Sequence, residues 1–167
     1  VIEEAAPGLA RSKNIGARAA CGDVLVFVDA DSRLGPGLLD AIRQQAVAGY
    51  DAGSIPVYSD GGDLLDRGFF ELMEFGKRLF DIHAQMFFCH RDRFLEAGGF
   101  DESMQLGEDR DLLLRLQEAK LRFCRIDNAR IVTSPRRLHR LPLRLGVPVT
   151  FMRWSMANWH VGRRWRY

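Results

Sequence analysis

The sequence lacks the features that define several classes of protein. Its 167 residues include three cysteines, Cys21, Cys89 and Cys124, an odd number without the spacing of a metal site or a disulfide framework. We therefore expect small buried cysteines in a reducing compartment. No apolar run approaches the roughly 20 residues of a membrane-spanning helix. The first residues, VIEEAAPG, lack a basic region, an apolar region and an initiator Met, so we expect no signal peptide and a start inside a longer protein.

Acidic residues are missing from the end of the chain. Residues 1–127 hold 15 basic and 22 acidic residues, a formal charge of −7, whereas the whole chain carries +2. The segment after Asp127 has nine arginines and no acid: Arg130, Arg136, Arg137, Arg140, Arg144, Arg153, Arg163, Arg164 and Arg166. With 47% apolar and 28% charged residues, the chain has the composition of a globular domain. The asymmetry predicts an acidic body and a basic tail that meets an anionic partner.

Strand and helix patterns alternate along the chain. We expect helices near residues 11–21, 34–49, 63–81 and 107–120, and strands near 23–29, 51–59, 121–127 and 129–134, with a short strand, a short helix and a Gly-Gly turn within 84–103. Pro56 places the strand at 51–59 near a sheet edge. Helical spacing of apolar residues makes 63–81 amphipathic: Leu65, Phe69, Leu72, Phe75 and Leu79. The alternation predicts an α/β fold.

Two carboxylates follow the most apolar strand, in GDVLVFVDADS. Residues two apart in a strand point the same way, so Asp29 and Asp31 can share one face at the carboxyl end, where open α/β sheets bind ligands. Two carboxylates there repel each other unless a cation joins them, and a hard divalent ion accepts carboxylate and phosphate oxygens. One interpretation is a Mg²⁺ or Mn²⁺ site for a diphosphate. The other is an acid that caps the following turn, and the motif alone does not decide.

Charged groups elsewhere extend this pattern. Arg11, Lys13 and Asn14 precede the strand by one short helix, and basic groups suit a phosphate-bearing donor. Three acids open a later helix after the turn at Gly107: Glu108, Asp109 and Asp111. These acids either complement the free N–H groups and the dipole of the helix, or include a general base within reach of a hydroxyl.

Three segments resemble, in this order, the family 2 glycosyltransferases of the GT-A fold: RSKNIGARAACGDVLVFVDADS, FFCHRDRFLEAGGFDES and GEDRDLLLRLQEAK. The resemblance covers most of the chain, residues 8–135. It implies a nucleotide-diphospho-sugar transferase fold, Rossmann-like, with a mixed sheet flanked by helices and without the first βα units of the family. We expect a partial GT-A domain over residues 1–135 and a basic, aromatic and helical tail over 136–167.

The resemblance also implies roles for individual residues. The catalytic base would be Asp109, and the divalent ion, Mg²⁺ or Mn²⁺, would bind Asp29 and Asp31. The donor side would comprise Arg11, Lys13, Asn14, Asp29, Arg136 and Arg137. The acceptor side would comprise Gly98, Gly99, Phe100 and Glu108. Ser134 stands near the place where many members have a metal-binding His, so Arg136 and Arg137 either hold the diphosphate instead or form a solvated basic turn.

The implied reaction is an inverting transfer from a UDP- or GDP-sugar to a hydroxyl of a saccharide or lipid-linked acceptor, as in cell envelope polysaccharide biosynthesis. Two alternatives remain. A non-catalytic, partner-binding module would keep the fold, whereas a nucleotidyltransferase would also use paired acids and a metal. The Glu-Asp helix after GGF argues against the nucleotidyltransferase.

The tail has a stripe of apolar residues at helical spacing: Val149, Met152, Met156 and Trp159. With its arginines and tryptophans it can lie on an anionic membrane face, but packing on the catalytic domain is the favoured interpretation. No nucleic-acid module is recognisable, so we expect no nucleic-acid partner. We expect a cytoplasmic chain, either free or peripheral on the inner face of the membrane. An exposed sheet edge would allow a homodimer.

Overall fold

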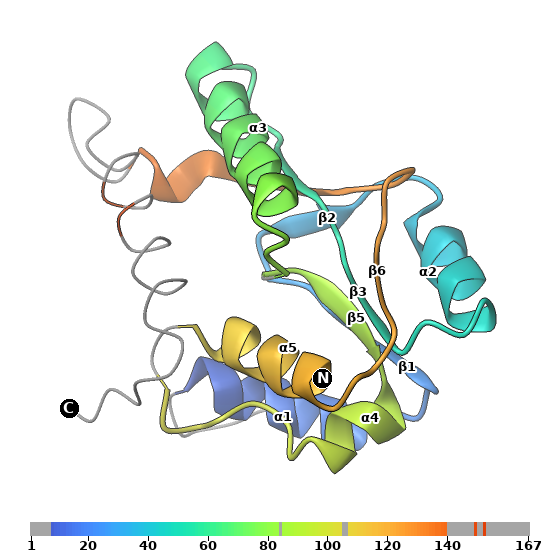
Figure 1. The fold of residues 1–167 in the computed structure, drawn as a ribbon. Helices are drawn as coiled ribbons and strands as arrows, with labels where there is room; N and C mark the ends of the chain where they lie inside the picture. The colour runs from blue at the N-terminus through green and yellow to red at the C-terminus, as the bar shows by residue number, and fades with distance from the viewer. Residues whose placement is uncertain (1–7, 84, 105–106, 140–148, 150–151, 153–167) are drawn as a thin grey trace.

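The computed structural model describes residues 8–83, 85–104 and 107–139, together with 149 and 152 (Figure 1). The elements are α1 (Leu9–Ala19), β1 (Val24–Phe27), β2 (Ser32–Leu34), α2 (Leu38–Val47), β3 (Ala52–Ser54), β4 (Val57–Ser59), α3 (Leu64–Leu79), β5 (Phe87–His90), α4 (Arg91–Glu96), α5 (Glu108–Glu118), β6 (Phe123–Arg125), β7 (Ile131–Thr133) and a 3-10 helix (Pro135–Arg137). Among the described residues, no helix is both long enough and apolar enough to cross a membrane.

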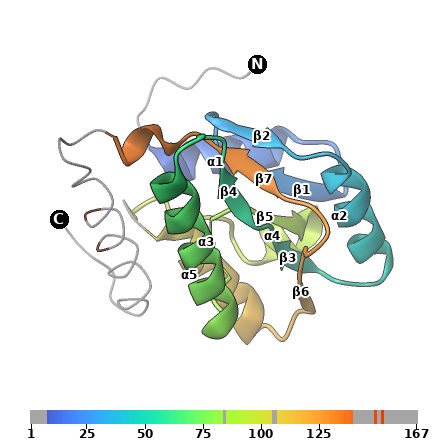
Figure 2. The ribbon, with the colours of Figure 1, turned by 90° about the horizontal axis from the view of Figure 1, so that it is seen from above.

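The strands form two sheets. The larger has the order β1-β5-β3-β6, in which β5 runs antiparallel to both neighbours and β6 runs parallel to β3. The smaller has the order β2-β7-β4, in which β7 is antiparallel to β2 and parallel to β4. The fold is thus mixed α/β with helices around mixed sheets, which confirms the fold class expected from the sequence (Figures 1 and 2).

Helices cover both faces of the larger sheet. Phe87 and Cys89 of β5 pack in one apolar cluster with residues of α1, α4 and α5. Phe88, between them, packs in a second cluster with residues of α2. Figure 1 shows α2 on one side of the strands and α1, α4 and α5 on the other. All three side chains are fully buried, and each of the two phenylalanines contributes roughly 1.5–3 kcal/mol, which explains why this strand is apolar on both faces.

Pro56 divides the strand that the sequence predicts over 51–59. β3 lies inside the larger sheet, and β4 lies at an edge of the smaller sheet. The carbonyl of Pro56 still accepts a hydrogen bond from the N–H of Ile131 at 2.9 Å. The prediction of an edge position is therefore confirmed for β4 and wrong for β3, because the chain crosses between sheets at the residue that lacks an N–H.

The face of α3 that apolar spacing marks as its buried side is mostly exposed. Leu65, Leu72, Phe75 and Leu79 are 63%, 60%, 62% and 64% exposed, and only Phe69 of the stripe is buried. The buried side instead carries charged residues beside Met73: Asp66, Glu74 and Lys77. The spacing thus predicts the helix but not the direction in which it faces.

All three cysteines are free thiols. Cys89 is buried and Cys124 is half-buried, and burial raises the pKa of these thiols to about 12 and about 11, respectively. Both are therefore protonated and unreactive at neutral pH, as buried cysteines are. Cys21 is exposed, so the expectation of burial does not hold for it.

Candidate active site

Asp29 and Asp31 lie in the loop between β1 and β2. β1 ends at Phe27, and the N–H of Ser32 donates to the carbonyl of Asp29 at 3.0 Å, which closes a tight turn. The alternation of a strand therefore does not set the directions of these two carboxylates, because the strand ends before both of them. Asp29 thus has the turn position that aspartate often takes, and both side chains are half-buried.

The end of β7 holds the Asp31 side of this loop. The N–H of Ser134 donates to the Asp31 carbonyl at 3.2 Å, and the Thr133 hydroxyl lies 3.5 Å from an Asp31 carboxylate oxygen. Arg136 completes the contact through an Nη2–Oδ2 distance of 3.2 Å, although its side chain is 71% exposed. The structure therefore brings together Asp31, predicted as a metal ligand, and Arg136, predicted for the donor side.

The chemistry of the loop suits a divalent cation only with ligands from outside the chain. Within the described residues, no group of three His, Cys, Asp or Glu side chains is placed to hold a metal ion. Asp29 and Asp31 offer carboxylate oxygens, which Mg²⁺ takes singly or in pairs while phosphate oxygens and water fill the other positions. Arg136 competes for one of these carboxylates. The donor set thus fits an ion bound jointly with a diphosphate.

The acids that open α5 meet a lysine from α1. Gly107, with φ at 84°, turns the chain into the helix. The Nζ of Lys13 lies 3.0 Å from Glu108 Oε1 and 3.5 Å from Asp109 Oδ1. The side chains of Lys13, Glu108 and Asp109 are 16%, 7% and 20% exposed, so Asp109 is the more accessible acid. Lys13 thus bridges two helices at a partly enclosed site.

The pKa values in this triad are shifted in different directions. Burial, and after it a hydrogen bond with Glu108, raises the pKa of Asp109 to about 7. Burial acts upward on the Glu108 pKa too, but the hydrogen bond from Asp109 and the charge of Lys13 outweigh it and lower that pKa. Burial acts downward on the Lys13 pKa, yet the charges of Asp109, Glu108 and Asp29 outweigh it and raise it. Lys13 therefore couples the Asp29 loop to α5 electrostatically.

Asn14 holds the GGF segment, Gly98 to Phe100, in place. Its Nδ2 donates to the carbonyl of Phe100 and to Glu102, both at 2.9 Å, and its Oδ1 accepts from the N–H of Phe100 at 2.9 Å. A Cβ added to Gly99, whose φ is 72°, would lie 2.7 Å from this oxygen. Asn14 is only 3% exposed and holds the GGF segment, so these contacts do not support the donor-binding role predicted for it.

Phe100 is a buried residue of the apolar cluster, and it also lines a cavity with Gly98 and Gly99, the other members of the predicted GGF acceptor segment. It is 2% exposed and makes edge contacts with the rings of Phe27 and Phe94. The Nζ of Lys13 lies 5.1 Å from the centroid of the Phe100 ring, a cation–π distance. Phe100 therefore contributes a cation–π contact that helps to hold Lys13 in place.

Arg115 is a residue that the sequence reasoning missed. Its guanidinium donates to the carbonyls of Ala97 and Gly99, the latter at 2.7 Å, and pairs with Asp111 at 2.9 Å. It thereby holds the Gly-Gly turn against α5. A cavity of about 350 Å³ beside this turn is lined in part by Gly98, Gly99, Asp111 and Arg115. The i, i+4 spacing of Asp111 and Arg115 was the available signal.

Two further donor-side predictions concern Arg11 and Arg137. Arg11 is exposed on α1, two positions before Lys13. The side chain of Arg137 lies outside the described part of the chain. Both remain predictions.

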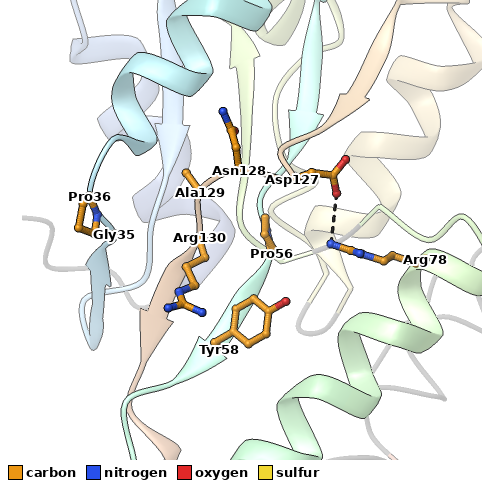
Figure 3. Close-up of a pocket in the computed structure, with 9 residues that line it drawn as sticks. All are labelled: Gly35, Pro36, Pro56, Tyr58, Arg78, Asp127, Asn128, Ala129 and Arg130. Atoms are coloured by element: carbon orange, nitrogen blue, oxygen red, sulfur yellow. Dashed lines mark hydrogen bonds and ion pairs between the residues drawn. The ribbon is translucent and has the colours of Figure 1, made fainter.

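A second cavity, of about 310 Å³, is lined in part by Gly35 and Arg130, next to the end of the smaller sheet where Leu34 pairs with Ile131 (Figure 3). Asp31 precedes Ser32, at the other end of this strand pair. Arg78 and Asp127 pair at 3.2 Å on one side of the cavity, and Arg130 stacks 5.4 Å from the Tyr58 ring centroid on the other. None of the predicted site residues lines it. It is therefore a separate feature of the surface.

Comparison with known families finds a family model that matches this chain. The model of the glycosyl transferase family 2 matches residues 1–98, more than half of the chain, and this match includes the Asp29–Asp31 loop but ends before Asp109. A comparison with curated proteins finds no match.

The mixed α/β fold, with an acidic loop after β1, is consistent with the GT-A type of nucleotide-sugar transferase. The chain belongs to the family 2 glycosyltransferases, which confirms the resemblance seen in the sequence. Membership ties the chain to glycosyl transfer and, in general terms, to a nucleotide-sugar donor and an acceptor.

Proposed function

We propose that this chain transfers a sugar from a UDP- or GDP-sugar to an acceptor hydroxyl, with inversion at the anomeric carbon. The observation that carries the proposal is the position of Lys13. It contacts Glu108 and Asp109 directly and lies within the field of Asp29. These relations support a single site that includes a base candidate and the predicted donor loop.

Asp109 is the proposed general base. A base with a pKa near the operating pH is the most efficient, and the pKa of this carboxyl is raised to about 7. Asp109 would take the proton of the acceptor hydroxyl as its oxygen bonds to the anomeric carbon. The nucleoside diphosphate would leave from the opposite side with the electrons of the broken bond. Glu108, which is less exposed, would hold Lys13 rather than contact the acceptor.

Asp29 and Asp31 are the proposed ligands of Mg²⁺ or Mn²⁺. When bound, such an ion neutralises the charge that gathers on the departing diphosphate. Arg136, at 3.2 Å from Asp31, supports a second version of this proposal. In that version the guanidinium itself balances the diphosphate, with help from Arg137, and Asp31 serves to position Arg136.

The acceptor is proposed to be a saccharide or a lipid-linked saccharide. The cavity beside Gly98 and Gly99 borders α5, which begins with Asp109, and its Asp111 and Arg115 are the polar groups that a sugar hydroxyl would meet. A lipid-linked acceptor would require contact with the inner face of the cytoplasmic membrane.

Calorimetric titration of UDP and GDP, with and without Mn²⁺, tests the donor site. We expect Mn²⁺-dependent binding that Asp31→Ala abolishes. Asp23→Ala is the matched control, because this exposed acid precedes β1 at its other end and should leave binding unchanged. Binding without Mn²⁺ that Arg136→Met abolishes would favour the second version. Binding of neither nucleotide would count against a donor site and for a non-catalytic module.

A further inference from the structure

The outer face of α3 carries a stripe with the spacing of a helix-packing seam. Leu65, Gly68, Leu72, Phe75 and Leu79 follow one another at intervals of three, four, three and four residues, and all five are exposed. A Cβ added at Gly68 meets nothing within 4 Å, so the space above this face is open. Alternation of three and four is the pattern by which two helices interlock side chains. Contiguous exposed apolar residues of this kind are a feature of interaction surfaces.

The same chain supplies a second stripe of this spacing. Val149, Met152, Met156 and Trp159 follow one another at intervals of three, four and three residues. The two of them that the structure describes, Val149 and Met152, are helical and are 37% and 55% exposed. Each stripe therefore has apolar surface left to bury, and each matches the other in period.

The last continuous described segment, residues 107–139, ends beside α3. Leu138 is 2% exposed and packs in a cluster with Phe69 and Met73 of that helix. The next residue, His139, places its Nε2 3.0 Å from the carboxylate of Asp66 in the first turn of α3. Both views show the 3-10 helix that precedes these residues beside the start of α3 (Figures 1 and 2).

Length allows the two stripes to meet. The nine residues from 140 to 148 can span at most about 30 Å. α3 has 16 residues, and a helix of that length extends about 24 Å. The stripe that begins at Val149 can therefore reach any part of α3.

We propose that the outer face of α3 is the docking site for the amphipathic C-terminal segment around Val149–Trp159 of the same chain. The point at which residues 107–139 end favours this occupant over an anionic membrane, because Leu138 and His139 contact α3 itself. Tethering favours it over a second copy, because a short linker holds the segment near α3 at millimolar effective concentration.

Tryptophan fluorescence of the full chain tests this docking directly. All three tryptophans, Trp154, Trp159 and Trp165, lie in the C-terminal segment, so their emission reports on its surroundings without a label. We expect blue-shifted emission from the unmodified chain. Leu72→Asp and, independently, Phe75→Ser should shift the emission to the red and increase quenching by acrylamide. Met156→Asp should do the same from the other side of the contact.

Leu39→Asp is the matched control, because Leu39 is an exposed leucine of α2, at 58% against 60% for Leu72. It should leave the emission unchanged. Emission that neither Leu72→Asp nor Phe75→Ser alters would overturn the proposal. A dimer in sedimentation that Leu72→Asp dissociates would overturn it in favour of a second copy. Emission that shifts only on adding phosphatidylglycerol vesicles, with binding lost in Leu72→Asp, would overturn it in favour of a lipid surface.

Discussion

Two lysine–glutamate pairs in this fold have opposite environments. Lys13 and Glu108 join α1 to α5 at 3.0 Å, with side chains 16% and 7% exposed, and Asp109 adds a second carboxylate at 3.5 Å. Lys77 and Glu74 lie one turn apart on α3 and are 2% and 4% exposed. In this second pair, which we call the sealed pair because both side chains are buried, Glu74 also accepts a hydrogen bond from the N–H of Val57 at 3.0 Å.

The difference appears in the lysine pKa values. Burial lowers the pKa of Lys77 despite Glu74, whereas the carboxylates around Lys13 outweigh burial and raise its pKa. A single carboxylate thus does not offset the effect of burial on the pKa of Lys77. Several carboxylates do offset it for Lys13, at the more open site. We infer that the pair on α3 fastens this helix to β4, whereas the triad at α5 keeps a carboxyl that can exchange a proton near neutral pH.

The largest effect should come from Asp109→Asn. Loss of a general base slows a reaction by about 10²–10⁴-fold, which corresponds to roughly 3–5 kcal/mol in barrier height. The rate is measured as release of UDP or GDP from the sugar nucleotide that calorimetry selects. Glu118→Gln, at the exposed C-terminal end of the same helix and outside the proposed acceptor cavity, should retain most of the activity. Comparable rates for the Asp109→Asn variant and the unmodified chain would show that Asp109 is not the general base.

The sealed pair should matter for stability instead. Glu74→Ala leaves the ammonium of Lys77 buried without its carboxylate, and breaking a buried pair in this way costs about 3–5 kcal/mol. Urea denaturation measures this loss in the free energy of unfolding. Glu71→Ala, at an exposed position of the same helix, should stay within about 0.5 kcal/mol of the unmodified chain. A loss below about 1 kcal/mol for Glu74→Ala would show that the pair does not fasten α3.

The smallest effect is a shift in pH dependence. Because Asp109 acts as a base only when ionised, kcat/KM should rise with pH and level off above its pKa of about 7. Lys13 lowers the pKa of Asp109, so Lys13→Met should move this rise to higher pH. Arg18→Met, at a more exposed position of α1, is the control and should leave the profile in place. An unchanged pH profile in Lys13→Met would show that Lys13 does not influence the pKa of the base.

The same pKa shift affects stability with a definite sign. The pKa of Asp109 rises from 3.8 to about 7 on folding, so the folded chain binds more protons between these values. The stabilising contribution of the protonated carboxyl is complete below pH 3.8 and is lost as pH rises through about 7. Urea denaturation across this range should show a decline in the unmodified chain that Asp109→Asn removes.

The fold class was predictable because the spacing of apolar residues agrees with the observed burial in most elements. The sequence predicts a short strand within 84–103, and β5 is that strand, with its apolar residues divided between the two clusters around Phe87 and Phe88. The outward face of α3 was not predictable, since apolar spacing does not distinguish a core face from a docking face. Asp66 faces inward toward His139, and Glu74 faces inward toward Lys77 and the N–H of Val57.

The candidate site was predictable as a set of residue types but not as a set of contacts. The motif around Asp29 and Asp31 marked an acidic loop, yet its partner Arg136 is more than a hundred positions away. Lys13 was expected to face a donor, and the structure places it on Glu108 and Asp109. Contacts between such distant residues depend on the completed fold, which no local pattern encodes.

The pairing of β2 with β7 has a consequence for the order of folding. Asp31 and Thr133 are 102 positions apart, and closing so long a loop costs entropy before any contact compensates it. The β1–β5 and β3–β5 pairs join nearer segments. We expect pulse-labelled hydrogen exchange to show protection in β5 before protection of the Ser134 N–H, and the reverse order would contradict this. A ribosome must release β7 before the acidic loop has its partners, so the donor loop would be among the last parts of a nascent chain to become competent.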